Sequence, residues 1–96
     1  MAYGVQAKQI SASGVITGNR AYFRKMLAFH SGTPDIVIEF YDRTAAPVGG
    51  EPHYDFHIYG KGDHDIDMPN AGILFKTGIY VVVPANTIVT VFYEDA

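Results

Sequence analysis

The sequence predicts an all-β fold, a single antiparallel β-sandwich of jelly-roll-like form with about eight short strands. Three observations predict it. The 96 residues contain 10 glycines and 5 prolines, which recur between short runs rich in Val, Ile, Tyr and Phe. In several of these runs the side chains alternate with a period of two, as they do along a strand. Patterns typical of an amphipathic helix are nearly absent.

Turn residues separate the expected strands, and we expect the longest loop at residues 43–52. A chain of this length is typical of one domain, so we expect a single sandwich over residues 1–96. Gly78 is expected to supply the positive φ of a tight three-residue hairpin. The expected strands are residues 3–10, 21–30, 36–42, 53–59, 63–68, 73–75, 79–83 and 87–93, with a short edge segment at 15–17.

The stretch at residues 21–30 is the one element whose type the pattern leaves open. Its length and its Ala, Met and Leu content also suit a helix. We prefer a strand because Phe23, Leu27 and Phe29 share one face at a period of two, and because no capping box precedes the stretch. Lys25 falls on that same face. It is interpreted either as an edge residue with its charge in solvent or as one half of a salt bridge across an interface with another protein.

Composition excludes several classes of protein. Lys and Arg total 7 and are scattered, and the net charge is −3, which argues against a nucleic-acid partner. Apolar runs fall far short of the ~20 residues of a spanning helix, so we expect no membrane partner. With no cysteine, disulfides and thiolate metal sites are excluded. Residues 1–4 show no secretory signal, so we expect synthesis in the cytoplasm.

Two expected strands, 79–83 and 87–93, are apolar on both faces. The outer strand of a lone sandwich should carry one polar face, so the second apolar face predicts contact with another protein. The alternative is that the loop at 43–52 or the N-terminal segment covers it. The expected interface residues are Tyr80, Val82, Val89, Val91 and Tyr93.

Histidine and aspartate are dense between residues 53 and 67. His53, Asp55 and His57 share one strand face at a spacing of about 6.6 Å, and imidazole and carboxylate groups suit zinc or another divalent ion. If the next strand forms a hairpin, Asp63 or Asp65 would add a fourth ligand. A solvent-facing strand shows the same pattern, and no hydrolase motif frames it. A metal site and a pH-sensitive contact through the histidines therefore stay open beside a simple solvated face.

Catalysis has little support in the sequence. There is no cysteine, no Gly-x-Ser-x-Gly nucleophile elbow, and no phosphate-binding glycine loop. We therefore expect a protein that is not an enzyme and that carries no cofactor.

Three segments resemble a known group of proteins. They read Ile-Glu-Phe-Tyr-Asp at 38–42, Gly-Ile-Leu-Phe-Lys-Thr-Gly-Ile-Tyr-Val at 72–81, and Val-Thr-Val-Phe-Tyr-Glu at 89–94. In order and spacing they are similar to the small β-sandwich structural proteins of tailed bacteriophages. The likeness covers residues 21–94 and is one of strand pattern and turn glycines. The chain departs from the pattern at 53–67, where histidine and aspartate are denser.

The resemblance implies a virion component, most simply a capsid decoration or cement protein that stabilises the phage head. Its partner would be the major capsid protein or another virion protein, and we expect a homo-oligomer, for example a trimer. A neck or tail accessory protein fits the same pattern. A carbohydrate- or receptor-binding module is a further alternative, since seven tyrosines offer stacking surfaces, although Trp is absent.

Overall fold

The computed structural model describes residues 4–32, 35–70 and 72–96. Within them every regular element is a strand, which confirms the all-β prediction. Residue 3, the expected start of the first strand, lies outside the described residues, and that strand begins at Gln6. The strands are β1 (Gln6–Ile10), β2 (Gly14–Thr17), β3 (Ala21–His30), β4 (Ile36–Tyr41), β5 (Tyr54–Ile58), β6 (Gly62–Asp67), β7 (Ile73–Phe75), β8 (Ile79–Val82) and β9 (Thr87–Asp95).

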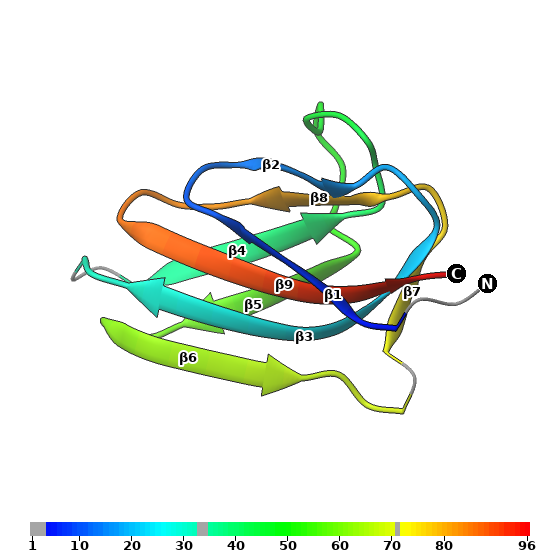
Figure 1. The fold of residues 1–96 in the computed structure, drawn as a ribbon. Helices are drawn as coiled ribbons and strands as arrows, with labels where there is room; N and C mark the ends of the chain where they lie inside the picture. The colour runs from blue at the N-terminus through cyan, green and yellow to red at the C-terminus, as the bar shows by residue number, and fades with distance from the viewer. Residues whose placement is uncertain (1–3, 33–34, 71) are drawn as a thin grey trace.

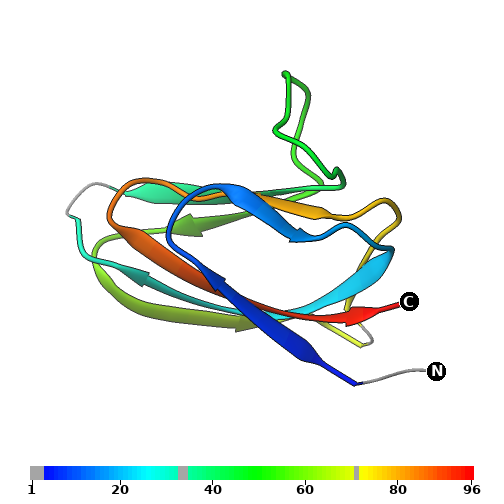
Figure 2. The same ribbon diagram turned by 45° about the horizontal axis from the view of Figure 1, so that its top comes forward.

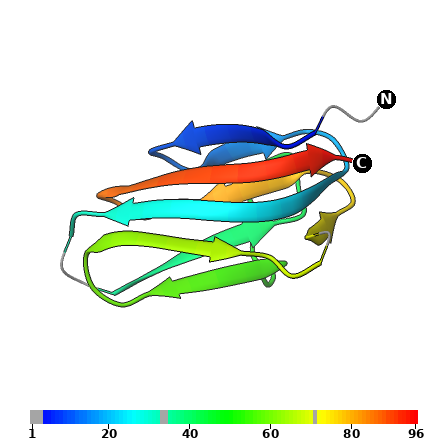
Figure 3. The same cartoon turned by 60° about the horizontal axis from the view of Figure 1, so that its bottom comes forward.

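The strands form two antiparallel sheets packed face to face (Figures 1 and 3). One sheet has the order β1-β9-β3-β6, with the short β7 also paired to β3; the other has the order β2-β8-β4-β5. If β7 is set aside, each sheet has four antiparallel strands, in the orders β1-β9-β3-β6 and β2-β8-β4-β5, which is the arrangement of a jelly roll. The jelly-roll-like sandwich expected from the sequence is therefore the fold.

The core lies between the sheets and is centred on aromatic rings. Phe23 of β3 stacks on Phe40 of β4, with ring centroids 4.5 Å apart and both side chains fully buried. Tyr54 and Phe75 pack edge-on against Phe23, at 6.0 and 6.3 Å. Each sheet thus contributes alternate side chains to one apolar layer, as expected for a sandwich.

Strand β3 contains a β-bulge that changes which face its side chains occupy. Phe23 pairs with Tyr93 and Lys25 with Phe92, so Arg24 is an extra residue on β3. Phe23 is therefore buried before the bulge, whereas Leu27 and Phe29 are exposed after it. The prediction that these three side chains share a face is wrong, because period-two alternation holds only where no residue is inserted.

Two connections that looked like hairpins cross between the sheets instead. β5 pairs with β4 in one sheet, and β6 pairs with β3 in the other. β7 and β8 are likewise in different sheets. Gly78 shows no positive φ; a Cβ there would lie 2.7 Å from the Thr17 carbonyl oxygen. This glycine therefore serves a close approach of backbones, and the expected hairpin role is wrong.

Asp42 closes the crossing between β7 and β8. Its carboxylate accepts hydrogen bonds from the backbone N–H groups of Lys76 (3.0 Å), Thr77 (2.7 Å) and Gly78 (3.3 Å). One side chain at the end of β4 thus satisfies three consecutive amides of the connection, which ties that connection to β4.

Candidate protein-contact surface

Three large apolar side chains are exposed together on the outer face of the five-stranded sheet. Leu27 and Phe29 of β3 and Ile88 of β9 are 39%, 45% and 41% exposed. Phe29 pairs with Ile88 across the two strands. We call these three residues the apolar strip. The bulge at Arg24 creates it, because without the extra residue Leu27 and Phe29 would point into the core.

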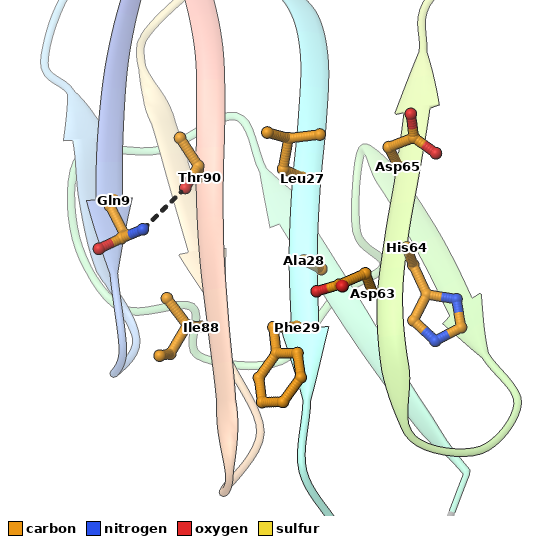
Figure 4. Close-up of a pocket in the computed structure, with 9 residues that line it drawn as sticks. All are labelled: Gln9, Leu27, Ala28, Phe29, Asp63, His64, Asp65, Ile88 and Thr90. Carbon is orange, nitrogen blue, oxygen red and sulfur yellow. Dashed lines mark hydrogen bonds between the residues drawn. The ribbon is translucent and has the colours of Figure 1, made fainter.

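Carboxylates border the apolar strip on one side. In the register of β3 with β6, Phe29 is opposite Asp63 and Leu27 is opposite Asp65. Figure 4 shows both aspartates beside the strip, with the Asp63 side chain directed toward β3. Among the described residues, neither carboxylate has an ion pair or a hydrogen bond from a side chain. The strip is therefore flanked by two uncompensated negative charges.

The other side of the strip is polar and uncharged. The Gln9 amide nitrogen of β1 donates to the Thr90 hydroxyl of β9 at 3.2 Å, and this bond is drawn in Figure 4. The strip, these two polar residues and the two aspartates line an open depression of about 430 Å³. Its composition, an apolar floor with polar walls, is typical of a contact surface.

The cations of this face are paired close to the bulge, away from Asp63. Arg24 Nη1 lies 2.6 Å from Glu94 Oε1, and Lys25 Nζ lies 3.6 Å from Asp67 Oδ1. The Lys25 pair joins neighbouring strands of one sheet and is therefore not the interface salt bridge that was one of the two interpretations of Lys25.

Three of the expected interface residues face the wrong way. Val89, Val91 and Tyr93 point into the core, and the prediction that they form an exposed second face of β9 is wrong. Burial, helped by the nearby charge of Asp95, raises the pKa of the Tyr93 phenol. It is Ile88, on the opposite face of the same strand, that is exposed. Tyr80 and Val82 are partly buried on the outer face of the four-stranded sheet.

The long loop at residues 43–52 does not lie over that outer face. Figure 2 shows it projecting away from the sandwich. Val48 within it is 89% exposed, which is incompatible with packing on a sheet. The alternative that this loop covers the second face of β8 therefore has no support in the structure.

His57 of β5 lies on the outer face of the four-stranded sheet, whereas His53, just before β5, contacts β7 of the other sheet. His53 Nε2 is 2.9 Å from the Leu74 carbonyl oxygen, and its ring packs edge-on against Phe75 at 4.5 Å. His57 Nε2 lies 3.6 Å from Asp55 Oδ2. His53 is thus occupied in joining β5 to β7, and His57 has one carboxylate partner.

The metal site that the sequence left open beside a solvated face is not assembled. Asp55 and His57 lie on the outer face of one sheet, His53 lies against β7, and Asp63 and Asp65 lie on the outer face of the other sheet. Within the described ranges no three His, Cys, Asp or Glu side chains lie where they could hold one ion. A four-ligand arrangement requires a β5–β6 hairpin, and the Gly60–Gly62 connection instead crosses between the sheets.

The apolar strip was missed in the sequence, although a signal for it was present. Met26 and Ala28 alternate with Leu27 and Phe29, so this half of residues 21–30 is apolar on both faces. The argument that predicts protein contact for strands 79–83 and 87–93 applies equally to residues 26–29, whose two faces are both apolar.

No protein-family model, no curated protein and no solved structure matches the chain. In the part of the chain that the structure describes, no helix has the length and apolar character of a membrane span.

Proposed function

We propose that this chain is a structural subunit that packs through the apolar strip onto another protein. A virion is the proposed setting, and a capsid decoration or cement protein of a phage head is the proposed role. The observation that carries the proposal is the exposure of Leu27, Phe29 and Ile88 side by side on the outer face of the five-stranded sheet.

The physical argument is one of uncovered apolar area. Full burial of such a side chain contributes about 1.5–3 kcal/mol, and these three are already more than half buried. Covering them therefore adds roughly 1 kcal/mol each. That gain suits a contact in which many copies each contribute modestly to the stability of a large assembly.

The fold is compatible with this role but does not carry it. Jelly rolls occur in viral capsid proteins and also in lectins, and a fold alone does not specify a function. The contact involves no turnover and no cofactor. Contacts between copies of the chain would use a different surface, for which Tyr80 and Val82 on the outer face of the other sheet are the proposed residues.

Co-sedimentation tests the proposal. The purified chain is mixed with heads of the phage that carries its gene, prepared without the chain, and its bound fraction is measured. We expect saturable binding that is weakened at least tenfold by the pair Leu27→Ser and Phe29→Ser. Neither change adds charge next to Asp63, and both positions are exposed, so folding should be retained and is checked by circular dichroism.

Val48→Ser is the matched control. It removes an exposed apolar side chain from the projecting loop, far from the strip, and should leave binding unchanged. The proposal fails if the wild-type chain does not sediment with the heads. It also fails if the Leu27/Phe29 pair and the Val48 change have equal effects.

A further inference from the structure

We propose that the occupant of the apolar strip is a protein segment that carries lysine or arginine beside an apolar anchor residue. The inference rests on the proposed function, because it names the chemistry of the partner at that same surface. The observation behind it is that two unpaired aspartates, Asp63 and Asp65, lie directly opposite Phe29 and Leu27 on the neighbouring strand.

The register arranges these groups as two parallel rows. One row runs from Asp63 through Phe29 to Ile88, and neighbouring strands are about 4.8 Å apart, so the row spans about 10 Å. The next row runs from Asp65 through Leu27, two residues further along the same strands. A partner that fills the apolar floor thus places its neighbouring side chains directly over a carboxylate.

The paired and unpaired charges around the strip indicate that the partner is positively charged. Arg24 and Lys25, the cations of this face near the bulge, are each within ion-pair distance of Glu94 or Asp67. No side chain in the described segments compensates Asp63 or Asp65. An acidic partner would bring further negative charge to these carboxylates as the contact excludes water, which is unfavourable. A basic partner completes the pairs.

A symmetric second copy of the chain does not meet this requirement. In a two-fold contact both copies present the same strip and the same two aspartates, and Arg24 and Lys25 of each copy are already paired. The chain as a whole carries a net charge of −3. The unpaired aspartates therefore favour a different protein as the occupant.

Nuclear magnetic resonance with short synthetic peptides tests the inference. Three peptides of equal length carry the same central Leu-x-Phe anchor, flanked by lysine, by serine or by glutamate. Each is titrated into the ¹⁵N-labelled full chain. We expect the lysine peptide to shift the amides of Leu27, Phe29 and Ile88, with an affinity that falls as salt rises. The serine peptide should bind more weakly and the glutamate peptide weakest.

Charge removal gives the second measurement. The pair Asp63→Asn and Asp65→Asn should weaken the lysine peptide about five- to tenfold, as expected for two partly exposed ion pairs, and leave the serine peptide unchanged. Asp55→Asn with Glu51→Gln removes two carboxylates from outside the five-stranded sheet and is the matched control, which should have no effect.

The outcomes separate this inference from the proposed function. The inference is overturned if the lysine peptide does not shift the strip amides, or if the serine peptide binds as tightly as the lysine peptide. It is also overturned if the aspartate pair makes no difference. The proposed function is judged independently by the Leu27/Phe29 effect on co-sedimentation, which does not depend on which peptide binds.

Discussion

The Asp42 carboxylate accepts a hydrogen bond from the Thr77 amide at 2.7 Å and so connects the end of β4 to the crossing between β7 and β8. Burial by itself would raise the pKa of Asp42. The hydrogen bonds from Thr77, Lys76 and Gly78, together with the charge of His53, outweigh that effect. The pKa therefore lies below its ordinary value of 3.8.

A lowered pKa makes Asp42 a source of acid sensitivity. The ionised carboxylate contributes to stability above about pH 4, and that contribution is lost as the pH falls through the lower pKa of the folded state. We expect Asp42→Asn to cost about 1–2 kcal/mol near neutral pH and less at pH 2.5. Urea unfolding across this range measures it. The Asp65 carboxylate accepts no such hydrogen bonds, so Asp65→Asn should show no comparable loss. If the unfolding free energies of the two variants depend on pH in the same way, Asp42 is not the source of the acid sensitivity.

The stacked pair Phe23 and Phe40 should be the largest single contributor to the core. Phe40→Ala removes a fully buried ring and is expected to cost about 3–5 kcal/mol, a large part of the stability of a domain this size. Phe40→Leu should cost less because more of the volume is kept. Tyr59→Ala, at an exposed position, should change the unfolding free energy by less than about 0.5 kcal/mol. A similar loss of stability in Phe40→Ala and Tyr59→Ala would contradict the burial of Phe40 in the core.

Gly78 should not tolerate even a methyl group. A Cβ there would lie 2.7 Å from the Thr17 carbonyl oxygen and 2.9 Å from Thr44 Cγ2. Gly78→Ala is therefore expected to destabilise the fold by about 1–3 kcal/mol. Gly18→Ala is the control, since its Cβ would meet nothing within 4 Å and its φ is not positive. Thermal unfolding compares the two, and equal melting temperatures would refute the close approach.

Deleting Arg24 should disrupt the fold more than its exposure suggests. Without the extra residue, Met26 and Ala28 would turn outward, and Leu27 and Phe29 would turn inward. We expect loss of a cooperative unfolding transition. Deletion of Ala45, which lies in the projecting loop, should keep the transition. An Arg24 deletion as stable as the Ala45 deletion would mean that the bulge does not set the register.

The positions of the strands could be predicted from the sequence, because turn residues mark their ends. The run at 21–30 coincides with β3, and the run at 73–75 coincides with β7. Local alternation also predicted that Asp55 and His57 share one face of β5, and both are exposed on that face. Each of these features depends on neighbouring residues only.

Features that depend on distant strands could not be predicted in the same way. The glycines at 60 and 62 permit either a hairpin or a crossing, since both adopt positive φ (89° and 124°). Which one forms depends on whether β6 gains more from β5 or from β3. The choice of the wrong face of β9 has a related cause, because Val89 and Ile88 are equally apolar and only the packing of β3 distinguishes them.

The bulge at Arg24 has a consequence for which side chains of β3 reach the outer face. On a regular strand, core-facing and solvent-facing positions alternate without interruption from one end to the other. Here the two halves of β3 are out of phase with each other. Ala21 and Phe23 face the core before the bulge, and Met26 and Ala28 face it after the bulge, so one inserted residue moves Leu27 and Phe29 to the outer face while the whole strand keeps its inner layer.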